Sequence, residues 1–128
     1  FFKWIMPVLK VKKAIEIGVF TGSSALVIAQ GMPDNGKLMA FDVSKEYTDV
    51  AQEMWKKAGV DHKIELELNG GIAGLDKLLQ NKNEYGTFDF AYIDAIKTEY
   101  HDYYEKLLPT LLTENDYDDG ISCCSEDE

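Results

Sequence analysis

Strand-like and helix-like segments alternate along this sequence of 128 residues, and no other feature constrains its fold as strongly. Short apolar runs predict the strands, and the segments between them have the spacing of helices. Such an alternation is typical of parallel strands joined by right-handed crossovers. We therefore expect an α/β fold, a Rossmann-like, doubly wound and mainly parallel sheet with helices on both faces. The predicted strands are 14–17, 37–41, 63–68 and 88–93, and the predicted helices are 23–30, 45–58, 70–79 and 100–111.

Two of these helices carry signals for their ends and their buried faces. Ser44 is suited to cap the second helix at its N-terminus, and Gly59 is suited to close it. Pro109 is expected to kink or end the last helix. Apolar residues at helical spacing predict one buried face in each helix. These residues are Tyr47, Val50, Ala51, Met54 and Ala58 in the second helix, and Tyr100, Tyr103, Tyr104, Leu107, Leu108 and Leu111 in the last.

The acidic residues are distributed unevenly along the chain. There are 23 Asp and Glu against 13 Lys and Arg, and residues 113–128 contain seven of the acids and none of the bases. We therefore divide the chain into one domain at 1–112 and an acidic C-terminal segment at 113–128, with a short last strand at 120–124. No basic stripe is available to neutralise phosphates, which argues against a nucleic-acid partner. No apolar run approaches the roughly 20 residues of a membrane-spanning helix, so we expect no membrane partner.

The cysteines and histidines point to no site of their own. Cys123 and Cys124 are adjacent, and neighbouring Cα atoms lie closer together than in an ordinary disulfide. We therefore expect reduced cysteines and a cytoplasmic location. His62 and His101 stand apart from each other, and we interpret both as surface residues.

Residues with useful chemistry fall at the ends of the predicted strands, where doubly wound sheets bind ligands. The first strand leads into the 18–22 loop, which begins and ends with glycine and so lets a ligand approach the main chain closely. Asp42 ends the second strand, and an acid at this point commonly accepts hydrogen bonds from ribose hydroxyls. Each feature alone also fits a plain turn, but together they favour a nucleoside ligand. The loop lacks the spacing G-x-G-x-x-G, which argues against a nicotinamide cofactor.

Three stretches of the chain resemble the cation-dependent O-methyltransferases, the family of the caffeoyl-CoA and catechol O-methyltransferases. The first stretch is 14–26, the second is Phe41-Asp42 with the helix that follows it, and the third is 88–95 followed by Lys97 and Tyr100. The similarity extends from about residue 8 to residue 112 with the spacings between the stretches intact. This agreement is far more specific than any one of the motifs.

The resemblance implies the class I methyltransferase fold, with S-adenosylmethionine as the methyl donor. It implies transfer to a small hydroxylated acceptor, either catechol-like or an acyl-CoA phenol, and it suggests a homodimer. Lys97 matches the lysine regarded as general base in the catechol-methylating branch, and Asp94 matches a ligand of a divalent cation such as Mg²⁺. By matching position, the donor would be held by Glu16, Gly18, Val19 and Ser24 at its amino-acid and ribose portions, by Asp42 at the ribose hydroxyls, by Gly71 at the adenine and by Asp94.

These implied roles agree with the chemistry of methyl transfer to a phenol. The phenol must lose its proton to attack well, and a cation bound to its oxygen lowers its pKa and orients it. A lysine beside that cation can accept the proton. Asp94 and Lys97 are therefore the catalytic candidates. Their alternatives are a helix cap for Asp94 and an ordinary surface lysine for Lys97.

The sequence also departs from the family pattern. Gly71 stands where the family usually has alanine, and Ile96 stands where it usually has an acid. Ser125 and Glu126 align with the Asp-Asn pair that completes the family's metal site. No counterparts of the family's N-terminal helices and last two strands are recognisable, so we expect a relative truncated at both ends. Two alternatives stay open: a non-catalytic or truncated S-adenosylmethionine-binding relative with a broken metal site, and a binding module for another nucleoside cofactor.

Overall fold

The computed structural model describes residues 2–95, 97–111 and 124–125. Its strands are β1 (Lys13–Ile17), β2 (Lys37–Phe41), β3 (Ile64–Glu67), β4 (Phe90–Ile93) and β5 (Cys124–Ser125). Its helices are α1 (Phe2–Val8), α2 (Ser23–Gly31), α3 (Lys45–Lys57), α4 (Gly71–Leu79) and α5 (Tyr100–Leu111). Among the described residues, no helix is long and apolar enough to cross a membrane.

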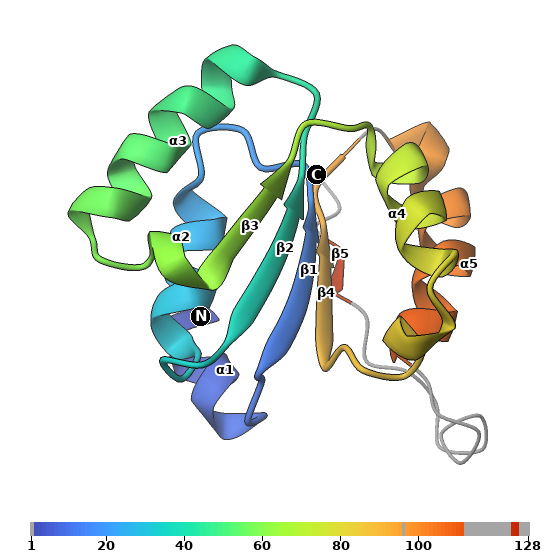
Figure 1. Ribbon diagram of the computed structural model, residues 1–128, viewed down its shortest axis with the longest axis horizontal. Coiled ribbons are helices and arrows are strands. Elements are labelled where there is room, and N and C mark those ends of the chain that lie inside the picture. The colour runs from blue at the N-terminus through green and yellow to red at the C-terminus, as the bar shows by residue number, and fades with distance from the viewer. Residues whose placement is uncertain (1, 96, 112–123, 126–128) are drawn as a thin grey trace.

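The strands form one parallel sheet in the order β3-β2-β1-β4-β5 (Figure 1). The helices α1, α2 and α3 lie on one face of this sheet, and α4 and α5 lie on the other. This arrangement confirms the predicted Rossmann-like fold with helices on both faces. The predicted last strand at 120–124 is represented by β5 at Cys124–Ser125, whereas residues 120–123 lie outside the described part of the chain.

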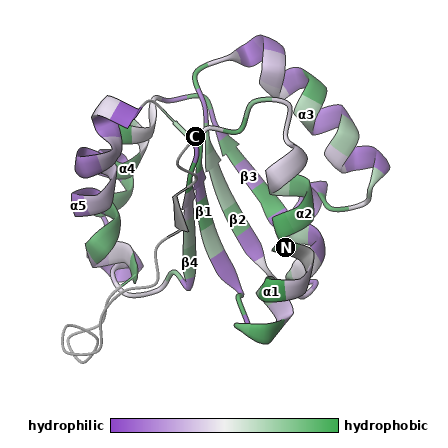
Figure 2. Ribbon diagram, turned by 180° about the vertical axis from the view of Figure 1, so that it is seen from behind, coloured by the Kyte–Doolittle hydropathy of each residue, from purple (hydrophilic) through white to green (hydrophobic). Residues whose placement is uncertain are grey.

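Alternate residues of the strands pack into two separate hydrophobic cores. Ala14 of β1 belongs to the core on the side of α1, α2 and α3, whereas Ile15 and Ile17 belong to the core on the side of α4 and α5. All four residues of β4 are buried, which confirms the interpretation of this segment as a central strand covered on both faces. Figure 2 shows hydrophobic residues along the strands and on α1. Helices α3 and α5 carry both hydrophobic and hydrophilic residues, as amphipathic helices do.

Helix α1 is a feature that the sequence analysis did not predict. Met6 is fully buried against α2, where a Cβ atom added to Gly31 would lie only 2.7 Å from the Met6 Cβ. The ring of Phe2 packs edge-on against Tyr92 of β4, with the ring centroids 4.9 Å apart. The helix has seven residues and contains Pro7, so its sequence carries little intrinsic helical signal. These tertiary contacts stabilise it instead.

The buried face of α3 differs from the predicted one. Tyr47 and Val50 are 50 % and 57 % exposed, whereas Ala51 is buried as predicted. The helix also buries Thr48 and Trp55, which were not part of the predicted face. The indole of Trp55 donates a hydrogen bond to the carbonyl oxygen of Gly22 at 3.0 Å, which fixes the rotation of the helix about its axis. The predicted ends of α3 are confirmed, because the Ser44 hydroxyl accepts from the Tyr47 amide and Gly59 has a positive φ of 73°.

Pro109, which was expected from the sequence to kink or end the last helix, does not end α5. The helix includes Pro109 and continues to Leu111, and it buries Tyr103, Leu107 and Thr110 on one side. Tyr104, which was predicted to belong to this face, is 40 % exposed. The carbonyl groups of Pro109 and Thr110 accept hydrogen bonds from the amides of Gly86 and Phe88, so the loop before β4 stabilises the last turn.

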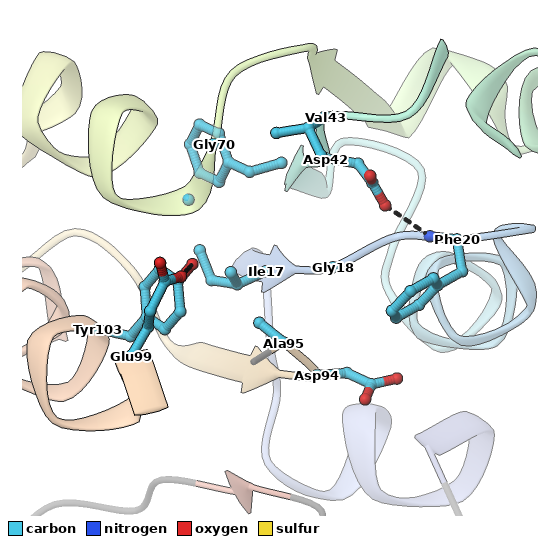
Figure 3. A pocket seen from close by; sticks show the side chains of 12 residues that line it. Ile17, Gly18, Phe20, Asp42, Val43, Gly70, Asp94, Ala95, Glu99 and Tyr103 are labelled. Carbon is cyan, nitrogen blue, oxygen red and sulfur yellow. Dashed lines mark hydrogen bonds between the residues drawn. The ribbon is translucent and has the colours of Figure 1, made fainter. Parts of the chain in front are cut away.

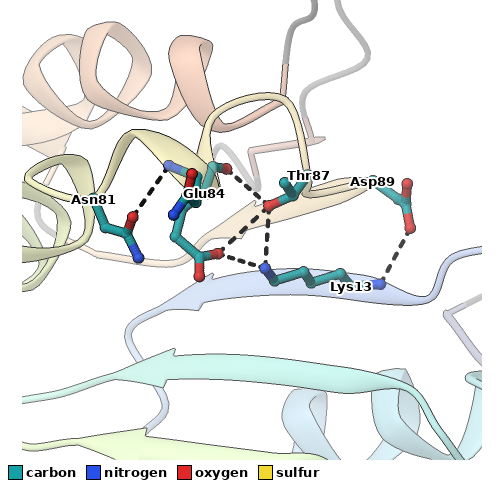
Figure 4. Close-up of polar contacts among 6 residues, drawn as sticks. Lys13, Asn81, Glu84, Thr87 and Asp89 are labelled. Atoms are coloured by element: carbon teal, nitrogen blue, oxygen red, sulfur yellow. Dashed lines mark hydrogen bonds and ion pairs between the residues drawn. The ribbon is translucent and has the colours of Figure 1, made fainter.

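A polar network at the amino end of the sheet fixes β4 beside β1 (Figure 4). The Lys13 ammonium forms an ion pair with Glu84 and donates to the Thr87 hydroxyl. The Asp89 carboxylate accepts hydrogen bonds from the main-chain amides of Lys12 and Lys13, at 2.9 and 3.1 Å. With this end anchored, Ile17 pairs with Ile93 at the opposite end, where the sheet meets the candidate site.

Candidate functional site

A cavity of about 510 Å³ lies at the carboxyl ends of β1, β2 and β4 (Figure 3). This is the edge of the sheet at which doubly wound folds bind ligands. Four residues predicted from the sequence line the cavity: Gly18, Asp42, Gly71 and Asp94. The other predicted residues, Glu16, Val19, Ser24 and Lys97, are not among its lining. The remaining lining residues are Ile17, Phe20, Phe41, Val43, Gly70, Ala95, Glu99 and Tyr103.

Gly18 brings the ends of β1 and β4 into unusually close contact. Its φ is +89°, a conformation that favours glycine, and its amide donates to the carbonyl oxygen of Phe41 at 2.9 Å. A Cβ atom at this position would lie 1.8 Å from the main-chain oxygen of Asp94. The amide of Asp94 in turn donates to the carbonyl of Ile17 at 2.8 Å. The main chain at Gly18 and Asp94 therefore forms one continuous wall of the cavity.

Asp42 holds the 18–22 loop against the end of β2. Its Oδ2 atom accepts hydrogen bonds from the amides of Val19 and Phe20, both at 2.8 Å, and its Oδ1 atom accepts from the Ser44 amide at 2.9 Å. One carboxylate thus positions the loop and the start of α3 together. The structure places Asp42 in the cavity, as predicted, and adds this main-chain role that the sequence did not indicate.

Glu16 is a fully buried carboxyl group beneath the same loop. The Ser24 hydroxyl donates a hydrogen bond to its Oε1 atom, and its Oε2 atom has no hydrogen-bond partner among the described residues. Burial raises the pKa of Glu16 to about 8, against the opposing effect of the Ser24 hydrogen bond, and the nearby carboxylates of Asp94 and Asp42 raise it further. A buried acid with an unpartnered oxygen is costly unless something completes it. A cationic ligand group would do so.

Glu99 and Tyr103 lie at the end of the cavity that α4 and α5 approach, and sequence reasoning missed both as site residues. The Tyr103 hydroxyl donates to the Glu99 Oε2 atom at 2.6 Å. Burial raises the pKa of Tyr103, and the hydrogen bond to Glu99 adds to this effect. A Cβ atom at Gly71 would lie 2.5 Å from the Tyr103 ring and 2.6 Å from the Ile17 side chain. The signal in the sequence is an acid and a tyrosine four residues apart, in the segment that follows β4.

Of the two predicted catalytic residues, only Asp94 lines the cavity. Asp94 follows β4 and lines the cavity, whereas Lys97 is an exposed residue of the short turn of 3₁₀ helix at Lys97–Glu99. Within residues 2–95, 97–111 and 124–125, no three His, Cys, Asp or Glu side chains come close enough to hold a metal ion. Glu126, aligned with a family metal ligand, lies outside the described residues. Both histidines are exposed, which confirms their interpretation as surface residues.

Comparisons with known proteins agree with this architecture. A family model described as O-methyltransferase matches residues 1–115. Probable caffeoyl-CoA O-methyltransferase 2 of Dictyostelium discoideum is 50 % identical over 111 residues, which are 87 % of this chain and 48 % of that protein. Tricin synthase 2 of Oryza sativa subsp. japonica is 48 % identical over 97 residues, which are 76 % of this chain and 33 % of that protein. The chain thus spans about half the length, or less, of these curated relatives.

The fold also matches solved structures. The O-methyltransferase from Bacillus cereus, solved in complex with SAH, superposes with a TM-score of 0.77 at 23 % sequence identity. The superposition covers 84 % of this chain and 48 % of that one. At this identity the likeness shows the fold alone.

Proposed function

This chain belongs to the O-methyltransferase family, and we propose that it binds S-adenosylmethionine in the cavity at the carboxyl ends of β1, β2 and β4. We further propose that the methyl group is transferred to a hydroxyl of a small phenolic acceptor, the class that the names of the relatives indicate. The observation that carries the proposal is the cavity itself, to which Gly18, Asp42, Gly71 and Asp94 are brought together from four separate segments of the chain.

The residues at the cavity fit the chemical groups of this donor. We propose that its amino-acid portion lies at the Gly18 end of the cavity. Glu16, Val19 and Ser24 would have to become accessible to contact it, because none of them lines the cavity. Its ribose carries two hydroxyls, which would donate to Asp42. Gly18 and Gly71 have no side chains, so the donor could approach the main chain closely at these two positions. A volume of about 510 Å³ is in the range of small-molecule sites.

The bound donor would supply an electrophilic methyl group on a sulfonium. The chain's part is to hold donor and acceptor in line, which supplies much of the acceleration in a displacement of this kind. Lys97 is proposed to take the proton of the acceptor hydroxyl. Asp94 is proposed as a wall of the donor site and as one ligand of a divalent cation. The described residues do not complete a cation site, so we assign no step of the reaction to a cation.

We also propose a cytoplasmic location and a homodimer, and a small molecule rather than nucleic acid or membrane as the partner. Cell fractionation and light scattering of the purified chain test the first two. Recovery of the protein in a nuclear or membrane fraction would contradict the cytoplasmic location. A monomer at all concentrations would contradict the homodimer.

The donor site is tested by calorimetric titration of the folded chain with S-adenosylmethionine, with and without magnesium. Asp42→Ala is expected to weaken binding by at least about tenfold, because charge-assisted hydrogen bonds to the ribose are lost. Asp49→Ala on the exposed side of α3 is the control and should leave the affinity unchanged. Thermal melting of each variant shows whether the loop that Asp42 holds has stayed folded.

The outcomes separate the alternatives. Binding that Asp42→Ala weakens, followed by methyl transfer to a catechol that Lys97→Met abolishes, supports the full proposal. Binding without transfer supports a non-catalytic S-adenosylmethionine-binding protein. A folded chain that binds no donor contradicts the proposal.

A further inference from the structure

Glu99 and Tyr103 form a polar pair in the cavity that the proposed function does not use. Figure 3 shows both side chains together at one end, away from Phe20 and Asp94. Glu99 belongs to the turn after β4, and Tyr103 belongs to the first turns of α5. Both line the cavity, although the rest of this end is apolar or glycine: Ile17, Val43, Gly70, Gly71 and Ala95. A single carboxylate in such surroundings restricts which ligand group can occupy them.

The Tyr103 ring gives Glu99 a rigid support. Tyr103 is only 4 % exposed, and its ring lies so close to Gly71 that even a methyl group there would collide with it. Its hydroxyl donates to the Glu99 Oε2 atom at 2.6 Å. This bond uses one of the two carboxylate oxygens and leaves Oε1 as an acceptor. A carboxylate oriented in this way can select among ligand groups, because its own position is already determined.

The two ends of the cavity differ in the ligand groups that they suit. The end beside the 18–22 loop is lined by Gly18 and Phe20, and the proposed function assigns it to the amino-acid portion of the donor. Asp42 lies between the ends and suits the ribose diol. The end lined by apolar residues and glycine then remains for the planar purine. Glu99 supplies a carboxylate there, and the Tyr103 hydroxyl already donates its proton to that carboxylate. An ionised carboxylate only accepts hydrogen bonds, so it pairs with an exocyclic amine and repels a ring carbonyl.

We propose that Glu99, positioned by Tyr103, accepts a hydrogen bond from the exocyclic amine of the purine and makes the site selective for a 6-aminopurine over a 6-oxopurine. The inference rests on the proposed donor site in this cavity. It adds Glu99, a specificity residue that is not itself among the residues by which the sequence resembles its family. The presence of glycine at position 71, where the family usually has alanine, supports the inference. The methyl group of an alanine there would collide with the Tyr103 ring.

The test compares two nucleosides by calorimetry, S-adenosylhomocysteine and its deaminated counterpart S-inosylhomocysteine. The unaltered chain is expected to bind the adenosyl compound about 30-fold more tightly, from one charge-assisted hydrogen bond. Glu99→Gln should reduce this preference to within about fivefold, because a carboxamide can accept from the amine or donate to the carbonyl. Tyr103→Phe keeps the ring and removes the hydroxyl, so it should reduce the preference in part. Glu105→Gln, at an exposed position of the same helix, is the matched control.

The possible results distinguish the inference from the function on which it rests. If the unaltered chain binds both nucleosides equally, or if Glu99→Gln keeps the full preference, the inference is wrong and the donor site stands. If a chain shown by circular dichroism to be folded binds neither nucleoside, the proposed donor site is wrong and the inference falls with it. Loss of the preference in Glu99→Gln but not in Glu105→Gln supports the proposal.

Discussion

Replacing Gly18 with alanine is expected to destabilise the protein by more than about 3 kcal/mol, through backbone strain and a main-chain collision. The φ of +89° alone disfavours any side chain. The added Cβ would also lie 1.8 Å from the Asp94 carbonyl oxygen, and that carbonyl belongs to main chain fixed by the Asp94–Ile17 hydrogen bond. Relief of this contact requires the ends of β1 and β4 to separate. The same movement would open the wall of the cavity.

Gly59 offers a matched control for this substitution. Its φ of +73° is similarly unfavourable for alanine, but no atom of the described part of the chain lies within 4 Å of its added Cβ. Gly59→Ala should therefore show the backbone strain alone, about 1 kcal/mol. Urea denaturation of both variants measures the free energy of unfolding, and the difference between them is the cost of the contact with Asp94. Equal losses in the two variants would contradict the close approach of β1 and β4.

The second large effect is a loss of stability as the pH rises through the titration range of Glu16. Its pKa is raised from 4.5 to about 8 in the folded chain. Between these values the folded state keeps a proton that the unfolded state has released, so the free energy of unfolding falls as pH increases. This one group should contribute a decline of about 1 kcal/mol per pH unit from roughly pH 5 to pH 8, and none above that range.

Glu16→Gln isolates this contribution. The carboxamide keeps an acceptor for the Ser24 hydroxyl and cannot ionise. The variant should match the unaltered chain near pH 4.5 and exceed its stability by roughly 2–4 kcal/mol at pH 8.5. Denaturation curves across this pH range provide the measurement, with the exposed Glu53→Gln as the control. A parallel decline in the Glu16→Gln variant would show that Glu16 is not the group responsible.

The strands were predicted well because the short apolar runs that mark them are local features of the sequence. The β2 strand at Lys37–Phe41 has its predicted bounds, and β1, α2 and α4 differ from prediction by one residue at an end. The errors arise where tertiary contacts override the local pattern. Trp55 is buried through its bond to Gly22, far away in the sequence, and this rotates α3 away from its apolar stripe. Met6 and Phe2 stabilise α1 against segments that local periodicity does not include.

The candidate site was predictable to the same extent. Gly18, Asp42, Gly71 and Asp94 were identifiable because strand ends and motifs mark them, and the structure brings all four to one cavity. Glu99 and Tyr103 were not, since their approach to Gly71 depends on how α4 and α5 pack. The hydrogen bonds from the Val19 and Phe20 amides to Asp42 could not be predicted for a similar reason, because they join residues more than 20 positions apart.

The central claim is that the cavity at the carboxyl ends of β1, β2 and β4 binds S-adenosylmethionine. Nuclear magnetic resonance of the ¹⁵N-labelled chain during titration with S-adenosylhomocysteine tests it most directly, because each amide reports its own surroundings. We expect shifts that saturate together at the amides of Gly18, Phe20, Gly70, Gly71 and Ala95. Amides at the amino end of the sheet, such as those of Lys12 and Lys37, should stay unchanged. A folded chain whose spectrum does not change, or whose shifts gather at the amino end, would contradict the claim.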